Sequence, residues 1–288
     1  EELRSLGHEA KGLRRLTTGM ALTDDWLWGD VTNADGLRAV SEFEPEIVCH
    51  LAAIASNAYA LKHPLETLRV NAMGTANMVE VCKQLPTAPW FILASSSEVY
   101  GGATAMVGVR SPLVPSNAYS VAKIAAEHYV RCSGLPFSIM RPFNTYGRAL
   151  VGQAVSVVDK FIVSALTNGW LTLLDPTPRR DFLFREDHVA AYLSLLSHQE
   201  VAQGKTYLFA TGTSTTIGAL AQMVALLTGA KIQERLQQRP GDIPVLEGDA
   251  SEAALELGWK AQVGLTEGVR KATGEWEQAL SIREPLHV

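Results

Sequence analysis

The chain has 288 residues, of which 47% are hydrophobic and 19% are charged. These proportions are ordinary for a globular enzyme and exclude the disordered and fibrous classes. The net charge is −5, and neither sign gathers into a block, so no nucleic-acid partner is expected. Apolar runs are too short for a membrane span and the first residues do not form a signal peptide, so we expect a cytoplasmic protein with no membrane partner.

Cysteine and histidine spacing gives no sign of a disulfide framework or a metal site. The three cysteines are odd in number and form no CxxC pair, which favours reduced, mostly buried thiols. Four histidines also lack the spacing of metal ligands and are assigned to structure: His50, His63, His128 and His188. We expect no metal.

The first half of the chain alternates short apolar runs with longer helical patterns. The expected strands are Trp26–Val31, Glu46–Ala52, Trp90–Ser95 and Phe137–Pro142. Between them lie two long expected helices, Pro64–Gln84 and Asn117–Cys132. This alternation predicts an α/β fold of the Rossmann type, a doubly wound parallel sheet.

The front end departs from that pattern. Glu1–Gly7 is typical of the end of a helix and His8–Leu13 of a weak strand, but no strand and Gly-rich turn precede them. A dinucleotide-binding fold normally begins with such a turn, whose amides hold the pyrophosphate. We expect that the sequence given begins inside the first helix of the domain. The alternative is a chain that has lost cofactor binding.

After Gly152 the pattern changes to mixed short strands and helices. The expected strands are Trp170–Leu174, Phe182–Phe184, Thr206–Phe209 and Ile232–Leu236, and the expected helices are Glu186–Leu196, Ile217–Leu227 and Leu265–Leu280. We therefore predict a cofactor domain over residues 1–150 and a smaller α/β substrate lobe over residues 151–288. Some segments of the second part are expected to return to the main sheet.

The motif Tyr119-Ser-Val-Ala-Lys123 places a phenol and an ammonium one helical turn apart on the same face. A nearby positive charge stabilises a phenolate, so Lys123 could lower the pKa of Tyr119 and make it a base for a hydroxyl proton. A surface tyrosine and lysine with this spacing also occur often. The catalytic interpretation of this motif is supported by a second segment of the sequence.

That second segment follows the strand Trp90–Ser95. Ser96, Ser97 and Glu98 come at the carboxyl edge of the predicted sheet, where ligands bind in folds of this type. The alternative is a serine-rich turn whose hydroxyls only cap the backbone.

Four motifs in succession resemble those of extended short-chain dehydrogenases/reductases that act on nucleotide sugars, the NAD(P)-dependent epimerase/dehydratase family. They are SSSEVYG, NAYSVAK, RPFNTYG at Arg141–Gly147 and RRDF at Arg179–Phe182. The resemblance covers essentially the whole chain. It implies that Ser96 binds the reacting hydroxyl, that Tyr119 is the general base, and that Lys123 holds the nicotinamide ribose.

The resemblance also implies the remaining contacts. Besides Tyr119 and Lys123, the expected cofactor-binding residues are Arg14, Arg15, Asp30, Val31, Leu51, Ala52, Ala53, Asn71 and Arg141. The expected substrate-binding residues, which would hold a nucleotide-diphosphate sugar, are Ser97, Asn144, Arg180 and Arg239. Guanidinium groups suit this task because they make bidentate contacts with phosphate.

The cofactor is expected to be NADP or NAD, with NADP favoured. Arg14 and Arg15 follow the weak second strand, where a ribose-binding acid would indicate NAD. A paired arginine there is similar to GDP-mannose 4,6-dehydratases. A basic surface loop is the alternative.

The family leaves several reactions open. Glu98 stands where dehydratases of this family carry the glutamate that removes the C5 proton, and the triplet Ser96-Ser97-Glu98 is most similar to GDP-mannose 4,6-dehydratases. A 4,6-dehydratase is therefore the preferred interpretation. The motif RPFNTYG is also similar to that of 4-epimerases and UDP-glucuronate decarboxylases, and Arg239-Pro-Gly-Asp-Ile-Pro with Gly248-Asp249 is similar to 4-keto-6-deoxysugar reductases, so these reactions stay as alternatives. A non-catalytic relative is the alternative from another class. Relatives pair through two long helices, so a homodimer or tetramer is expected.

Overall fold

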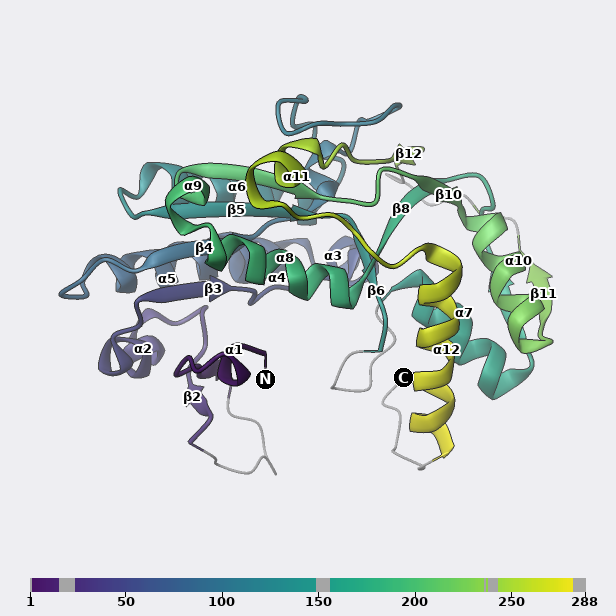
Figure 1. Ribbon diagram of the computed structural model, residues 1–288, viewed down its shortest axis with the longest axis horizontal. Helices are drawn as coiled ribbons and strands as arrows, with labels where there is room; N and C mark the ends of the chain where they lie inside the picture. Colours follow the sequence, from purple (N-terminus) through teal and green to yellow (C-terminus); the bar gives the residue numbers. More distant parts are fainter. Residues whose placement is uncertain (1, 16–23, 149–155, 236, 238–242, 282–288) are drawn as a thin grey trace.

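The computed structural model describes residues 2–15, 24–148, 156–235, 237 and 243–281 (Figure 1). Its main sheet has four parallel strands in the order β3-β4-β5-β9. They are β3 (Ile47–His50), β4 (Trp90–Ala94), β5 (Phe137–Pro142) and β9 (Lys205–Phe209). The first four residues of β4 are buried, as expected for a strand covered on both faces, whose apolar run is continuous rather than alternating.

Helices cover both faces of this sheet. On one face α2 (Arg38–Phe43), α5 (Gly74–Lys83) and α6 (Ala118–Cys132) enclose a core that includes Phe91 and Leu93. On the other face α8 (Arg185–Ser197) and α11 (Ser251–Leu257) enclose Ile92 and Met140. The sheet is therefore doubly wound, and the predicted Rossmann-type α/β class is confirmed.

The N-terminal segment forms a separate small two-stranded sheet. After α1 (Glu2–Ser5), strand β1 (Gly12–Arg14) pairs in parallel with β2 (Trp26–Trp28). The expected strand His8–Leu13 is thus displaced toward the carboxyl end, because its pairing begins only where Gly12 meets Trp26. The short helix η1 (Ala34–Leu37) follows β2 and is capped by Asn33, which accepts from the N–H of Asp35.

The long helix expected from Pro64 is interrupted. It consists of α4 (Pro64–Leu68), a π-helical turn η2 (Arg69–Met73) and α5, and it follows the short helix α3 (Asn57–Lys62). Pro64 occupies the first turn, where its missing N–H leaves no helical bond unmade. The π-turn accommodates an extra residue and directs Asn71, which is fully buried, inward.

The second lobe lies at the right of Figure 1 and has its own core. It contains α7 (Val157–Asn168), β7 (Trp170–Leu173), β8 (Arg179–Phe184), β10 (Ser214–Thr216), α10 (Ile217–Thr228), β11 (Lys231–Glu234) and α12 (Leu265–Ser281). Strand β8 is the centre of a sheet in which β10 pairs antiparallel, and β6 (Asn144–Tyr146) and β12 (Val245–Leu246) pair parallel. The chain returns to the main sheet through α8, α9 (Gln199–Ala202) and β9.

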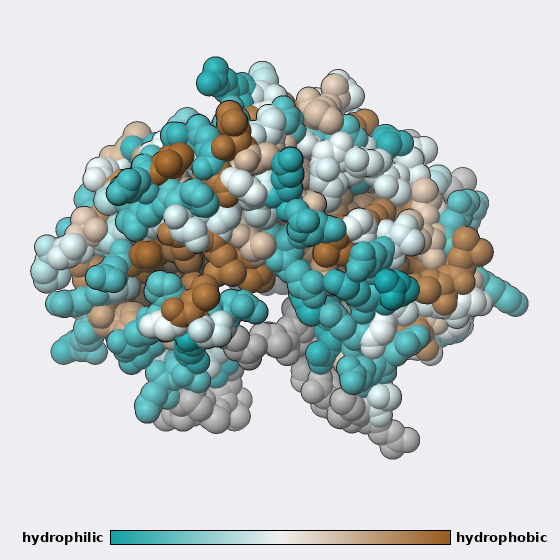
Figure 2. All heavy atoms as spheres, in the orientation of Figure 1, coloured by the Kyte–Doolittle hydropathy of each residue, from teal (hydrophilic) through white to brown (hydrophobic). Residues whose placement is uncertain are grey.

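The lower side of the molecule is hollowed between the two lobes (Figure 2). The four-stranded sheet with its helices lies on one side of the hollow, and α7 and α12 lie on the other. In the part of the chain that the structure describes, none of the helices combines the length and apolar character that crossing a membrane requires.

Candidate active site

Three buried polar residues directly follow β4. Ser96, Ser97 and Glu98 are 9%, 2% and 9% exposed, and they open the short helix η3 (Ser97–Tyr100). The Ser96 Oγ atom accepts a hydrogen bond of 3.2 Å from the backbone N–H of Glu98, which caps this helix. The capping role that the sequence left as an alternative is therefore real, and it fixes Ser96 and Glu98 relative to each other.

Helix α6 supplies the phenol and the ammonium. Asn117 and Ser120 form a capping box, in which the Asn117 Oδ1 atom accepts from the N–H of Ser120 at 2.9 Å and the Ser120 Oγ atom accepts from the N–H of Asn117 at 3.1 Å. This box defines where the helix begins, just before Tyr119. Tyr119 and Lys123 follow one turn apart and are both buried, at 8% and 4% exposed.

The structure brings Tyr119 together with Ser96 and Glu98. Burial raises the pKa of Tyr119 to about 12, a hydrogen bond with the Ser96 side chain works to lower it, and the charge of Glu98 works to raise it. Because this pKa lies far above neutrality, the phenol is protonated at pH 7 in this arrangement. The phenol on α6 thus meets the segment that joins β4 to η3.

Lys123 lies against the end of β4 rather than over the phenol oxygen. Its Nζ atom donates to the carbonyl of Ala94 at 2.6 Å and lies 5.9 Å from the centroid of the Tyr119 ring. Burial lowers the pKa of Lys123 to about 8, although the charge of Glu127 works to raise it. The expected lowering of the Tyr119 pKa by Lys123 is not found, because burial dominates at the phenol and the ammonium is directed toward a backbone carbonyl.

The expected cofactor residues near the N-terminus lie at the carboxyl ends of β1 and β2: Arg14 is the last residue of β1, and Arg15 and Asp30 come just after the two strands. The Arg14 guanidinium stacks on the rings of Trp26, at 4.1 Å, and Trp28, at 5.0 Å. Arg15 has a side chain 71% exposed, and its Nη1 atom lies 3.9 Å from a carboxylate oxygen of Asp30. Burial works to raise the pKa of Asp30, but hydrogen bonds from Thr32 and the charges of Arg15 and a neighbouring arginine lower it overall. An ionised acid and an exposed guanidinium therefore stand side by side.

The loop after β3 carries Leu51, Ala52 and Ala53, of which Leu51 is 58% exposed. Asn71 reaches this loop from the π-turn: its Oδ1 atom accepts from the N–H of Ile54 at 2.7 Å, and its Nδ2 atom donates to the carbonyl of Ile54 at 3.0 Å. The side chain of Asn71 is thus bound to the protein backbone and joins the π-turn to the loop after β3.

Val31, another expected cofactor residue, lies against Gly74, the first residue of α5. A Cβ atom on Gly74 would lie 2.8 Å from the Cγ2 atom of Val31, so the first turn of α5 approaches Val31 this closely because position 74 is glycine.

Two of the expected substrate residues, Asn144 and Arg180, lie on the paired strands β6 and β8. Asn144 lies on β6, and its Oδ1 atom is buried without a hydrogen-bond partner among the described residues. Arg180 lies on β8, is 8% exposed, and donates to the carbonyls of Arg179 and Ile243. Arg239 lies outside the described residues.

Arg141 was expected on the cofactor, but its guanidinium forms hydrogen bonds with protein groups. It is 3% exposed and bound to Glu127, to the hydroxyl of Tyr100 and to the carbonyl of Val109. This placement gives the expected cofactor contact no support. Glu127 was not identified from the sequence, and its signal is the position one turn after Lys123 on the same face of α6.

A parallel sheet wound on both faces, with serine, tyrosine and lysine side chains meeting at the carboxyl end of a central strand, defines a short-chain dehydrogenase/reductase of the extended, nucleotide-sugar-modifying class. The chain belongs to the GDP-mannose 4,6 dehydratase family within this class, since that family model matches residues 22–272. In the described residues, no cluster of three or more metal-ligating side chains occurs.

The curated relatives of this chain have several activities. It is 28% identical over 262 residues to a GDP-6-deoxy-D-mannose reductase of Pseudomonas aeruginosa, with 86% of each chain covered. It is 27% identical to a UDP-glucose 4-epimerase of Mycolicibacterium smegmatis, covering 92% of this chain and 90% of the relative. It is 31% identical to UDP-glucuronic acid decarboxylase 3 of Arabidopsis thaliana, covering 78% and 68%.

Solved structures agree with the fold. The chain is similar to Thermus thermophilus UDP-glucose 4-epimerase in complex with NAD, with a TM-score of 0.87, 26% identity, and 96% and 94% of the two chains covered. It is also similar to MoeE5 in complex with UDP-glucuronic acid and NAD, with a TM-score of 0.84, 27% identity, and 97% and 94% covered. These similarities place the chain among nucleotide-sugar enzymes at the level of the family.

Proposed function

We propose that this protein is an NAD(P)-dependent sugar-nucleotide 4,6-dehydratase whose substrate resembles GDP-mannose. The observation that carries the proposal is the position of Glu98, which is buried beside Tyr119 and close enough for its charge to affect the phenol. A 4-epimerase or a 4-reductase needs no second base at this place. A dehydratase does, because it removes a proton from C5 as well as from the C4 hydroxyl.

The residues would divide the reaction as follows. Ser96 hydrogen-bonds the C4 hydroxyl. Tyr119, whose phenol is protonated in the protein alone, would act as the base in its phenolate form, stabilised once cofactor and substrate are bound, and would take the hydroxyl proton while C4 loses a hydride. Glu98 then removes the C5 proton, which the C4 ketone has made acidic, and returns it to the departing C6 oxygen so that water leaves. The hydride returns to C6, and C5 receives a proton equivalent to the one that Tyr119 took from the C4 hydroxyl, which gives a 4-keto-6-deoxy sugar. The bound nicotinamide supplies the hydride acceptor and donor and ends unchanged.

The donor set at the carboxyl ends of the strands fits a nicotinamide dinucleotide. Lys123 would hold the nicotinamide ribose, and Asp30 would lie on the adenosine side. Arg15 is exposed next to Asp30, which supports NADP as the cofactor, because a guanidinium can bind a 2′-phosphate. Arg14 has its face against two tryptophan rings, so Arg15 is the better candidate for that contact. NAD is the alternative, and two solved relatives are described as complexes with it.

The sugar diphosphate would lie at β6 and β8. The buried Oδ1 atom of Asn144 is an acceptor with an unmade hydrogen bond, which a sugar hydroxyl could supply. Arg180 and Arg239 are proposed to meet the phosphates, and Ser97 the sugar. We also propose a homodimer or tetramer formed through the helices at 64–83 and 118–132, which expose the apolar side chains of Leu65, Met73 and Val121.

A decarboxylase is the second candidate. The Arabidopsis decarboxylases include relatives that are 30% and 31% identical, and Glu98 would then stand beside a sugar carboxylate carbon instead of a hydroxymethyl carbon. The reductase relative from Pseudomonas aeruginosa supports a further alternative, in which Tyr119 donates a proton to a C4 ketone.

The test is incubation of the purified protein with NADP or NAD and separately with GDP-mannose, dTDP-glucose, UDP-glucose and UDP-glucuronate, with products followed by mass spectrometry. Loss of one water from a hexose nucleotide is expected. The variant Glu98→Gln should then oxidise C4 and accumulate reduced cofactor without losing water. Loss of carbon dioxide, or an altered sugar of unchanged mass, would replace the proposal with a decarboxylase or an epimerase.

A further inference from the structure

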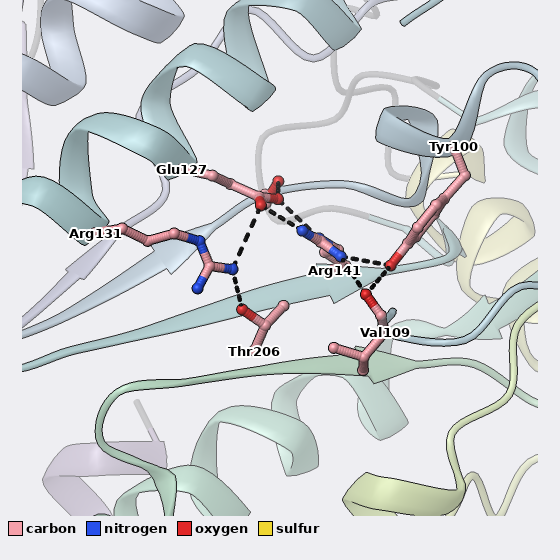
Figure 3. Close-up of polar contacts among 7 residues, drawn as sticks. Tyr100, Val109, Glu127, Arg131, Arg141 and Thr206 are labelled. Carbon is pink, nitrogen blue, oxygen red and sulfur yellow. Dashed lines mark hydrogen bonds and ion pairs between the residues drawn. The ribbon is translucent and has the colours of Figure 1, made fainter. Parts of the chain in front are cut away.

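One buried ion pair next to the active site has no part in the chemistry proposed above. Glu127 on α6 and Arg141 on β5 are 1% and 3% exposed in their side chains. The Arg141 Nε atom donates to Oε1 of Glu127 at 2.8 Å, and its Nη2 atom donates to Oε2 at 2.5 Å (Figure 3). This bidentate geometry fixes both side chains in orientation, which a single contact would not do.

Glu127 also holds the end of β4. The Ser95 Oγ atom donates to Oε1 of Glu127 at 2.5 Å, and the neighbouring carbonyl of Ala94 accepts from Lys123 at 2.6 Å. Two successive turns of α6 therefore bind the two residues that come directly before Ser96. The distance between Ser96 on the strand and Tyr119 on the helix depends on these two hydrogen bonds.

Arg141 holds the other end of the same segment. Its Nη1 atom donates to the Tyr100 hydroxyl at 2.5 Å and to the Val109 carbonyl at 3.1 Å (Figure 3). Tyr100 is the last residue of η3, the short helix that carries Glu98. The segment between Ser95 and Tyr100 is thus bound at both ends by one ion pair.

We propose that Glu127, held by Arg141, is a positioning residue that fixes the segment carrying Ser96 and Glu98 against the helix carrying Tyr119 and Lys123. The inference rests on the proposed function for the roles of those four residues. A buried ion pair is by itself weak support for stability, since apolar replacements are often equally stable. Here the pair has directed hydrogen bonds to Ser95 and Tyr100, on both sides of the site, which an apolar pair could not make.

The same carboxylate acts on the charge of Lys123. The groups that face this ammonium are Tyr119 and Glu127 from α6, His50 from β3 and the Ala94 carbonyl from β4. Burial lowers the pKa of Lys123 and Glu127 works to raise it, so Glu127 keeps more of the ammonium charged near neutral pH. His50, whose pKa is about 3 because of its burial and of Lys123, is neutral there.

The kinetic test compares Glu127→Gln with Ser95→Ala, which leaves the Glu127–Arg141 pair in place and is expected to fold. Both should lower kcat with little change in KM. Glu127→Gln should have the larger effect, up to about 100-fold, because a displacement of ~1 Å in reacting groups can lower a rate that much. The matched control is Asp187→Asn, the same chemical change at a buried carboxylate that binds the N–H groups of Gln262 and Val263.

A second readout needs no substrate. In protein labelled with ¹³C at lysine Cε, the Lys123 resonance is identified by its loss in Lys123→Arg, and its titration midpoint is measured by NMR. The midpoint should fall in Glu127→Gln and stay in place in Asp187→Asn and Ser95→Ala. If no nucleotide sugar reacts, the proposed function fails while this titration still tests Glu127. An unchanged midpoint together with an unchanged kcat in Glu127→Gln would overturn the inference.

Discussion

Three buried carboxylates, one in the first half of this molecule and two in the second, have different partners. Beside β4 and α6, Glu127 faces the guanidinium of Arg141. In the second half, Asp181 accepts from the N–H groups of Thr211 and Gly212, both at 2.9 Å, and Asp187 binds two N–H groups of the segment before α12. A carboxylate that binds backbone N–H groups fixes the path of a loop. A carboxylate paired with a guanidinium aligns side chains that come from separate elements.

The largest expected effect lies in the first region, where polar atoms serve the reaction. Tyr119→Phe removes one oxygen and keeps the packing of the ring. We expect kcat to fall by roughly 100-fold to 10,000-fold, the range that a positioned acid–base group contributes. The free energy of unfolding should change by about 1 kcal/mol, since the substitution removes the hydrogen bond with the Ser96 side chain.

The control for this variant is Tyr129→Phe on the same helix. Tyr129 is exposed and its hydroxyl donates to Glu80 at 2.9 Å, so activity should be retained. Turnover of the identified nucleotide sugar and urea unfolding measure the two quantities. An active Tyr119→Phe protein would contradict the assignment of the base.

Acid should destabilise the first region through His50. Burial and the charge of Lys123 hold the pKa of His50 at about 3 in the folded protein, whereas an unfolded histidine has a pKa near 6.5. The unfolded chain therefore binds this proton first, and stability falls as the pH drops from about 6.5 toward 3, by up to about 1.4 kcal/mol per pH unit.

His50→Gln should remove this contribution while keeping a hydrogen bond to Thr75. Urea unfolding at pH 7 and pH 5 measures it. The free energy of unfolding of His50→Gln should still fall somewhat between pH 7 and pH 5, because burial also lowers the pKa of His188, to about 4. If the free energy of unfolding fell equally with pH in the wild-type protein and in His50→Gln, His50 would already be protonated at pH 5 in the folded state.

The smallest expected effect is on stability alone and lies in the second region. Asp187→Asn places an amide group against the N–H of Gln262 or Val263, so one buried hydrogen bond is lost. The free energy of unfolding should fall by about 1–3 kcal/mol. The kcat of the folded protein should not change. A loss of kcat without a loss of stability would mean that Asp187, like Glu127, aligns groups of the active site.

The sequence predicted the parts of this structure that depend on local patterns. The strand Phe137–Pro142 has the predicted limits, and the strand predicted at Trp90–Ser95 ends one residue earlier, because continuous apolar runs mark strands buried on both faces. The meeting of Ser96 with Tyr119 followed from their places at a sheet edge and on a helix, and the hydrogen bond between them confirms that they meet.

Other features depend on contacts between distant segments. The strands β6, β10 and β12 are only two or three residues long, and they form because β8 offers them edges. Arg141 belongs to a motif that suggested a ligand contact, yet its guanidinium faces Glu127, and a single sequence does not show which carboxylate an arginine will meet. The role of Glu127 was missed for the same reason.

The π-turn at Arg69–Met73 has an evolutionary consequence. Such turns contain one more residue than the α-helix they interrupt, so deleting one residue would join α4 and α5 into a regular helix. Residues on the α5 side would keep nearly the same rotation relative to α4, because the wider π-turn absorbs the extra residue that a regular helix lacks. Asn71 would lose its two hydrogen bonds to Ile54, while both helices would keep their lengths nearly unchanged. A single codon deletion could therefore release the loop after β3 within an otherwise intact fold.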